Sequence, residues 1–277
     1  MVKLHLKKFD ISSIDSDKVI VAIGKRGTGK TYVIKDLLYY HRDIPVGTLI
    51  SGTEHANKTF SDHIPSIFIH KECTPELLDK VMKRQDVMMK RLNKEIKTYG
   101  KTSLDPRAFL ILDDCLHDSS WAKNKNIKYV FMNGRHQKFF AVISMQYPLG
   151  IPPNLRTNID YVFIMRENNF SNRKRLYDAY AGMFPTFEMF CHVLDACTEN
   201  YECLVINTTA QSNKLQDQVF WYKAEDHGNF TMCCKSAWEI HNANQQNNSD
   251  SDSDNEIFDP KAFCKKMSKK FSVMKVM

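Results

Sequence analysis

Residues 24–31 read Gly24-Lys25-Arg26-Gly27-Thr28-Gly29-Lys30-Thr31, a complete G-x-x-x-x-G-K-T pattern. An apolar, β-branched run at 19–23 precedes it, and a helix-compatible segment at 32–41 follows it. This order of strand, glycine-rich loop and helix is the context in which the pattern forms a phosphate-binding loop. The alternative is an ordinary glycine-rich turn, which the four fixed positions and the flanking elements disfavour.

The residue types in this loop fit a nucleoside triphosphate. Glycines let the backbone curl so that successive N–H groups point at the phosphates, and the positive end of the following helix adds to the attraction. Lys30 is predicted to reach the β- and γ-phosphates, and Thr31 is predicted to hold Mg²⁺. We therefore expect ATP and Mg²⁺ as ligands, with every residue of 24–31 contributing to the nucleotide site.

A second motif is the apolar run Phe109-Leu110-Ile111-Leu112, which ends in Asp113 and Asp114. The carboxyl end of a buried parallel strand opens into the ligand crevice of an α/β sheet. Asp113 is predicted to hold the Mg²⁺ shell, and Asp114 is predicted to polarise the attacking water. The alternative is a strand that ends in an ordinary acidic turn. A second acid at this place is typical of P-loop enzymes that hydrolyse ATP to do mechanical work.

Polar residues near a further apolar strand complete the expected catalytic set. The run at 139–145 leads to Gln146, which is predicted to sense the γ-phosphate and orient water. Arg135, Arg156 and Arg166 lie near the ends of neighbouring strands. Any of them can offset the negative charge that develops on the transferred phosphoryl group, and each also fits an ordinary ion-paired arginine. Arg135 and Arg156 are the catalytic candidates among them.

Composition and charge restrict the class of protein. The chain has 277 residues, of which 43% are hydrophobic, so it can bury a substantial core. No apolar stretch approaches the roughly 18–20 residues of a membrane span, and the first eight residues are too charged for a signal peptide. We therefore expect no membrane span and an intracellular location. The net charge of +7 permits contact with a polyanion without proving it.

Eight strand-like runs alternate with helical segments. The runs are predicted near residues 19–24, 47–51, 66–70, 109–113, 140–145, 160–166, 201–208 and 218–223. Several are almost continuously apolar, which indicates strands buried on both faces in a mostly parallel sheet. The alternation of strands and helices predicts an α/β domain of three layers.

The longest helix is predicted at about 75–99, where apolar residues from Leu77 to Tyr99 follow one stripe, expected to pack on the sheet, and lysines and arginines lie largely off it. The basic face is either an ordinary solvated surface or a surface that touches nucleic acid. We expect an ATPase domain at 1–240, a disordered acidic linker at 241–258 and a basic amphipathic tail at 259–277. The tail either docks on a partner or is an unstructured end.

Taken together, these motifs resemble one family. The order of the P-loop, Leu112-Asp113-Asp114, Gly134-Arg135-His136, Met145-Gln146-Tyr147-Pro148 and Leu155-Arg156 is similar to that of the genome-packaging ATPases of large cytoplasmic DNA viruses, poxviruses among them. That family belongs to the FtsK–HerA superfamily of DNA-pumping motors. The resemblance covers roughly residues 15–225. FtsK–HerA motors commonly have glutamate after the magnesium aspartate, whereas this chain has Asp114, like the viral packaging branch.

The resemblance carries several implications. It implies a three-layer P-loop NTPase fold of the ASCE/RecA-like type, with a central parallel sheet in the order 5-1-4-3-2 and further strands on one edge. It implies ATP-driven translocation of double-stranded DNA into a preformed capsid by a homo-oligomeric ring, with six subunits as the expected number and an arginine finger supplied across subunits. It further implies capsid or virion assembly proteins as partners and the host cell cytoplasm as the location, with the virion as a second one.

Two other functions remain open at this point. A P-loop nucleotide or small-molecule kinase fits the length, although no arginine-rich lid segment is visible and the Asp113-Asp114 doublet is unusual for a kinase. A nucleotide-regulated scaffold would use ATP only as a structural ligand, although the intact Lys30, Thr31 and Gln146 argue against an inactive site. Hydrolysis of ATP that is stimulated by DNA distinguishes all three.

Overall fold

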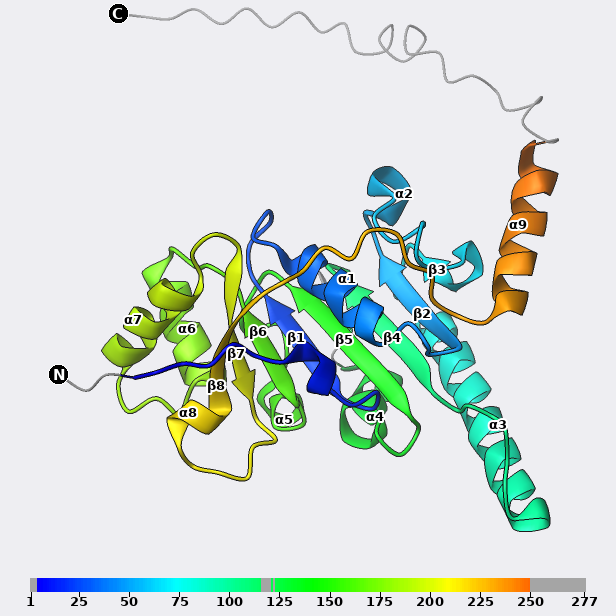
Figure 1. The fold of residues 1–277 in the computed structure, drawn as a ribbon, viewed down its shortest axis with the longest axis horizontal. Coiled ribbons are helices and arrows are strands. Elements are labelled where there is room, and N and C mark those ends of the chain that lie inside the picture. Colours follow the sequence, from blue (N-terminus) through cyan, green and yellow to red (C-terminus); the bar gives the residue numbers. More distant parts are fainter. Residues whose placement is uncertain (1–3, 116–120, 122, 250–277) are drawn as a thin grey trace, which may run out of the picture.

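The computed structural model describes residues 4–115, 121 and 123–249. Within them the chain forms one eight-stranded sheet in the order β3-β2-β4-β5-β1-β6-β7-β8 (Figure 1). The strands are β1 (Val19–Ile23), β2 (Val46–Ser51), β3 (Ile69–His70), β4 (Ala108–Asp113), β5 (Phe139–Met145), β6 (Tyr161–Ile164), β7 (Glu202–Asn207) and β8 (Val219–Lys223). Each of the eight predicted runs therefore contains a strand, although the run at 66–70 is a 3₁₀ turn (Ser66–Phe68) followed by only two strand residues.

The strands from β3 to β6 are parallel, and β7 and β8 continue the sheet in antiparallel fashion. The central order β6-β1-β5-β4-β2 is the expected 5-1-4-3-2 arrangement, with β7 and β8 added at one edge. The P-loop strand β1 lies between β5 and β6, so the strand that leads to Gln146 is its direct neighbour. The predicted fold class is confirmed.

Helices cover both faces of the sheet. They are α1 (Lys30–Tyr40), α2 (Glu54–Asn57), α3 (Pro75–Tyr99), α4 (Lys125–Asn133), α5 (Pro153–Arg156), α6 (Phe170–Tyr180), α7 (Phe187–Cys197), α8 (Leu215–Gln218) and α9 (Lys235–Ser249). Alternate residues of β1 serve two separate cores: Val21 packs with α3, α4, α6 and α7, and Ile20 packs with α1 and the N-terminal segment. Burial on both faces explains why the strand sequences are apolar without alternation.

The long helix α3 begins and ends at strong local signals. The Thr74 hydroxyl accepts a hydrogen bond from the Leu77 N–H, Pro75 occupies the first turn, and Gly100 adopts a φ of 72° after the last turn. The predicted bounds are therefore correct. However, the buried residues of α3 end at Gln85, and the second half of the helix extends past the sheet (Figure 1). Tyr99, expected on the packed stripe, is 73% exposed.

The expected start of the disordered linker at 241 is wrong, because α9 continues through Ser249. Tertiary contacts hold this helix despite its Asn- and Gln-rich composition. The Trp238 indole N–H donates to the Met232 carbonyl at 2.7 Å, and the buried His241 Nδ1 accepts from the Ser66 N–H at 3.0 Å. The remainder of the expected linker and the basic tail at 259–277 lie outside the described residues.

Candidate nucleotide-binding site

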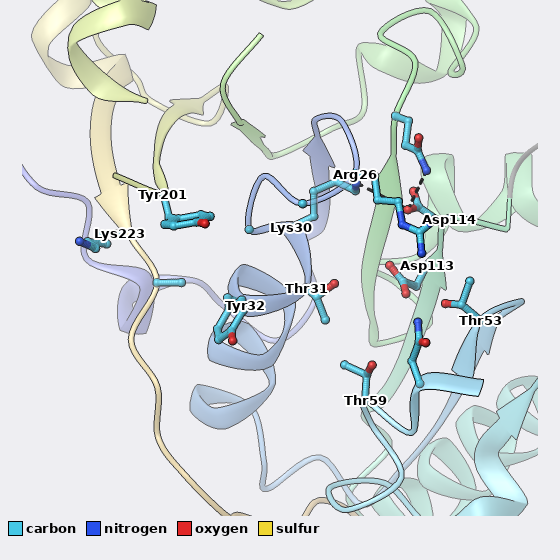
Figure 2. A pocket seen from close by; sticks show the side chains of 15 residues that line it. Arg26, Lys30, Thr31, Tyr32, Thr53, Thr59, Asp113, Asp114, Tyr201 and Lys223 are labelled. Atoms are coloured by element: carbon cyan, nitrogen blue, oxygen red, sulfur yellow. Dashed lines mark hydrogen bonds and ion pairs between the residues drawn. The ribbon is translucent and has the colours of Figure 1, made fainter. Parts of the chain in front are cut away.

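A cavity of about 830 Å³ opens at the carboxyl ends of the parallel strands (Figure 2). This is the edge at which α/β sheets bind ligands, and the volume is within the range of small-molecule sites. The cavity is lined by Arg26, Gly27, Gly29, Lys30, Thr31, Tyr32, Thr53, Asn57, Thr59, Asp113, Asp114, Gln146, Tyr201, Lys223 and Ala224. The P-loop, both acids and the glutamine, which are far apart in sequence, therefore meet at one place.

Two glycines of the P-loop are required by its geometry. Gly29 has a φ of +99°, a left-handed conformation that other residues rarely adopt, and it directly precedes the first residue of α1. A Cβ on Gly24 would lie 2.5 Å from the Cβ of Met165, directly after the neighbouring strand β6, which is closer than the two atoms can approach. The loop therefore turns tightly over the sheet and presents the amino end of α1 to the cavity.

The Lys30 ammonium lies between the P-loop and the acids. Its Nζ donates to the Gly24 carbonyl at 2.8 Å and to the Lys25 carbonyl at 3.2 Å, and it lies 3.5 Å from Asp114 Oδ2. The side chain is only 6% exposed. Its charge is therefore fixed at the place where the β- and γ-phosphates of a nucleotide in the P-loop would lie.

Asp113 ends β4 in a nearly buried position. Ser51, at the end of the adjacent strand β2, donates its hydroxyl hydrogen to Asp113 Oδ2 at 3.2 Å. Burial, and to a lesser extent the charge of Asp114, raise the pKa of Asp113 above its ordinary value. A cation beside it would favour the charged form of this carboxylate. Oxygen donors from Asp113 and Thr31 in one cavity fit Mg²⁺, which prefers such ligands and retains several waters.

Asp114 lies one residue further, where the backbone turns out of the strand with a φ of 44°. The Gln146 amide donates to Asp114 Oδ2 at 3.1 Å, and the Ser144 hydroxyl approaches Oδ1 at 3.4 Å. The pairing of Asp113 with Ser144 between β4 and β5 produces this contact, because it aligns the ends of the two strands. The carboxylate is 25% exposed, so it can be reached by water.

Three predicted nucleotide-binding residues do not line the cavity. The Lys25 ammonium forms an ion pair with Glu167 at 2.7 Å, on the far side of the P-loop from the acids. The Thr28 hydroxyl donates to the Lys25 carbonyl at 2.8 Å and stabilises the loop. Gly24 forms the base of the loop against Met165. Arg26, in contrast, extends from the loop across the cavity toward the two acids (Figure 2).

The structure does not bring Arg135 or Arg156 to the cavity of the same chain. Arg135 donates to Asp160 Oδ1 at 2.8 Å, and Asp160 Oδ2 accepts from the N–H of Val19, the first residue of β1. This ion pair lies at the amino end of the sheet, separated from the P-loop by the five residues of β1, a distance of about 16 Å. Arg156 donates to the Ile151 carbonyl and packs over the Tyr180 ring.

The sequence prediction missed seven residues that line the cavity. Three of them follow the carboxyl end of β2: Thr53, Asn57 and Thr59. Because β2 is expected beside β4, and ligands bind at the carboxyl ends of parallel strands, the loop after β2 could have been predicted to line the site. The other four lie at the opposite end of the cavity: Tyr32, Tyr201, Lys223 and Ala224. No motif marks Tyr201 and Lys223, because the antiparallel strands β7 and β8 bring them to the site.

The described residues also limit how a metal ion could be held at the site. They contain no group of three or more His, Cys, Asp or Glu side chains arranged to hold a metal ion by themselves. The Mg²⁺ expected beside Thr31 and Asp113 would therefore depend on the phosphates and on water for its other ligands. In the same part of the chain, no helix combines the length and apolar character needed to cross a membrane.

The fold and the site together define a P-loop NTPase. The chain belongs to the Poxvirus A32 protein family, whose sequence profile matches residues 6–228. An uncharacterized protein of Acanthamoeba polyphaga mimivirus is 40% identical over 225 residues, which are 81% of this chain and 78% of that protein. An uncharacterized protein of Invertebrate iridescent virus 6 is 40% identical over 222 residues, which are 79% of this chain and 82% of that protein. The resemblance to the poxvirus-type family is confirmed.

Solved structures agree with this assignment at the level of the fold. The genome packaging NTPase B204 of Sulfolobus turreted icosahedral virus 2, in complex with sulfate, superposes with a TM-score of 0.52 at 13% sequence identity. The superposition covers 78% of this chain and 100% of the B204 chain. The conjugation coupling protein TcpA bound to ATPγS gives a TM-score of 0.53 at 13% identity, over 78% of this chain and 61% of its own.

Proposed function

We propose that this protein is an ATP-driven motor that translocates double-stranded DNA and packages a viral genome into a preformed capsid. The observation that carries the proposal is the convergence of Lys30, Asp113, Asp114 and Gln146 in one cavity of a poxvirus-type chain. The similar fold of a viral genome packaging NTPase supports the same function. The proposed setting is the host cell cytoplasm at the site of virion assembly, with capsid or virion assembly proteins as partners.

The proposed chemistry assigns one role to each side chain. Lys30 and the P-loop N–H groups bind the β- and γ-phosphates, and Arg26 adds positive charge over the acids. Thr31 and Asp113 would hold Mg²⁺, which neutralises charge on the phosphates. Asp114 accepts the proton of the attacking water, and the Gln146 amide orients that water through its contact with Asp114.

The proposed DNA-contacting surface is the exposed second half of α3. Beyond Gln85 this helix buries no residue, and it extends past the sheet (Figure 1). Its exposed cations are Lys90, Arg91, Lys94 and Lys97. Positive side chains on a protruding helix can reach the phosphates of a duplex without reading its sequence, as a packaging motor requires.

The proposal includes a homo-oligomeric ring, with six subunits as the expected number. In such a ring an arginine of one subunit completes the site of its neighbour. Arg135 remains our first proposal for this role and Arg156 the second, since neither reaches the cavity of its own chain. The ring is tested by measuring mass in solution with and without Mg²⁺ and a non-hydrolysable ATP analogue.

The function itself is tested by ATP hydrolysis with and without duplex DNA. A motor is stimulated by DNA and releases inorganic phosphate. A nucleotide or small-molecule kinase requires an acceptor that ends up phosphorylated, and a scaffold binds ATP with almost no turnover. The four convergent residues favour hydrolysis over either alternative, because a kinase does not require a water-polarising acid beside Gln146.

A further inference from the structure

Two tyrosines lie at the end of the cavity that is opposite the acids. Tyr32 on α1 is 61% exposed, and Tyr201, directly before β7, is 71% exposed. Both line the cavity, together with Lys223 and Ala224 from the end of β8. Figure 2 shows Tyr201 and Lys223 on one side of the P-loop lysine and Asp113 and Asp114 on the other. The proposed catalytic roles do not use either ring.

The backbone that presents Tyr201 is strained. Asn200 has a φ of 49° and Tyr201 a φ of 65°, so two consecutive residues other than glycine are left-handed. Asparagine tolerates this conformation, whereas a bulky residue such as tyrosine seldom adopts it. A turn in which the Glu202 N–H donates to the Glu199 carbonyl at 2.9 Å holds the pair in place. Such strain is concentrated at ligand sites, where it fixes a side chain in a required position.

The strained turn places the Tyr201 side chain against the P-loop. A Cβ built on Gly29 would lie 3.8 Å from Tyr201 Cδ1, which is an ordinary van der Waals contact. Tyr32 lies two residues after Lys30, on the first turn of α1. The two tyrosines therefore come from distant parts of the chain and lie close to the loop that binds phosphates.

The P-loop determines which part of a nucleotide reaches them. Lys30 lies where the β- and γ-phosphates bind, and the γ-phosphate must face Asp114 and Gln146 for water to attack it. The α-phosphate and the nucleoside then extend in the other direction along the cavity, toward Tyr32, Tyr201 and Lys223. Exposed aromatic rings at this end are suitable for stacking on a nucleobase.

We propose that Tyr201 and Tyr32 form the nucleobase subsite and bind a purine by stacking. The inference rests on the proposed nucleotide-binding function and adds the substrate class. Among the described side chains that line this end of the cavity, the polar groups are two tyrosine hydroxyls and the Lys223 ammonium. The carboxylates and amide close to Tyr201 in the chain line a separate hollow beside it and not this cavity: Glu199, Asn200 and Glu202. Adenine and guanine present similar stacking surfaces, and a pyrimidine presents less. The subsite therefore accepts ATP and GTP alike.

The test uses equilibrium binding, so that it does not depend on hydrolysis. Calorimetric dissociation constants in Mg²⁺ are measured for ADP, GDP, CDP and inorganic tripolyphosphate, which has no base. We expect ADP and GDP to agree within about threefold and CDP to bind about tenfold more weakly. Tyr201→Ala and Tyr32→Ala each weaken ADP binding by about tenfold, the scale of one lost base–aromatic stack. Neither changes the affinity for tripolyphosphate, and Tyr201→Phe and Tyr32→Phe bind ADP like the wild type.

Tyr99→Ala is the matched control, because Tyr99 is equally exposed but lies on α3, outside the cavity. Unchanged ADP binding in both alanine variants overturns the proposal, as does an equal loss for ADP and tripolyphosphate, which indicates damage to the P-loop. If the dissociation constants for ADP and GDP differ by more than about thirtyfold, the subsite does distinguish adenine from guanine, and that part of the proposal is wrong. Melting temperatures confirm that each variant is folded. A wild type that binds ADP but never hydrolyses ATP contradicts the motor and leaves this proposal standing.

Discussion

The Gln146 amide donates a hydrogen bond to the Asp114 carboxylate at 3.1 Å, across the ends of two neighbouring strands. Gln146 follows Met145, whose carbonyl accepts from the Gly24 N–H at the start of the P-loop. The residue proposed to orient water is therefore connected both to the water-polarising acid and to the loop that holds the phosphates.

Asp114→Asn should separate nucleotide binding from hydrolysis. The amide retains the shape of the side chain but cannot accept the proton of water, so we expect kcat to fall by about 10²–10⁴-fold, the usual contribution of a general base. The dissociation constant for ATP with Mg²⁺ should change little, because Lys30 and Asp113 are intact. Steady-state kinetics and calorimetry measure the two effects. If this variant hydrolyses ATP at the normal rate, Asp114 does not activate the water, and Gln146 is the first residue to test for that role.

The contact between Lys25 and Glu167 should stabilise the fold in a pH-dependent manner. Burial alone would raise the pKa of Glu167, but hydrogen bonds from Lys25, Asn169 and Asn172 together hold it below its ordinary value. A depressed pKa in the folded state gives stabilisation that is complete above the unfolded pKa, about 4.5, and is lost as the pH falls through the folded pKa.

Glu167→Gln should accordingly lower the free energy of unfolding by about 1–2 kcal/mol at pH 7. The difference from the wild type should shrink as the pH falls from about 5 to about 3. Urea denaturation at several pH values measures it. Glu225→Gln is the control, because Glu225 forms an exposed pair with Lys8 and should contribute little. A difference between Glu167→Gln and the wild type that does not vary with pH contradicts the assignment.

Arg135→Ala tests two roles of this arginine: its ion pair with Asp160 within the fold, and its proposed contribution to the nucleotide site of a neighbouring subunit. Loss of the ion pair leaves the Asp160 carboxylate, 8% exposed, without its counter-charge, so the melting temperature should fall by a few degrees. We further expect hydrolysis to fall by roughly three to five orders of magnitude if the arginine completes a neighbour's site.

Mixing separates the two roles. Arg135→Ala subunits mixed with Asp114→Asn subunits should regain activity, because some interfaces then pair an intact Arg135 with an intact Asp114. A mixture that forms rings but never exceeds the sum of its components assigns Arg135 to the fold alone. Arg156 is then the next residue to test by mixing, since it too lies outside the cavity of its own chain.

Binding of duplex DNA should depend on the second half of α3 and on salt. We expect affinity to fall steeply between about 50 and 200 mM salt, and to depend little on sequence. The triple variant Lys90→Glu, Arg91→Glu, Lys94→Glu should bind at least about tenfold more weakly and show a shallower salt slope. Fluorescence anisotropy measures both. Lys174→Glu, on α6, is the control; equal losses in the two variants, or a salt-independent affinity, contradict the assignment.

The sequence was sufficient to predict the centre of the sheet because the strands β1, β4, β5 and β6 are buried along their whole length. A continuous apolar run such as 109–112, bounded by polar residues, is typical of a strand that helices cover on both faces. The P-loop and the pair of acids could be predicted because chemistry restricts both residue type and spacing. The long helix could be predicted from Thr74, Pro75 and Gly100, which are local signals for its ends.

Features produced by tertiary contacts could not be predicted. Lys25 has the right spacing for a phosphate contact, but Glu167, 142 positions later, binds it. Sequence order alone places Arg135 at the amino end of β5 and Gln146 at its carboxyl end, but the ion pair of Arg135 with Asp160, 25 positions later, could not be predicted. Tyr201 reaches the cavity only because β7 is added beside β6. Helix α9 continues past residue 241, where the linker is expected from composition, because Trp238 and His241 make tertiary contacts that composition does not reveal.

The most direct test of the motor is the rate of phosphate release from ATP, measured with and without duplex DNA for the wild type and Lys30→Ala. Lys30 is the ammonium nearest the expected phosphates, and its loss removes charge stabilisation that is typically worth several kcal/mol in such sites. We predict hydrolysis that rises severalfold with DNA in the wild type and is absent in a folded Lys30→Ala variant. Hydrolysis that ignores DNA, or persists without Lys30, would contradict it.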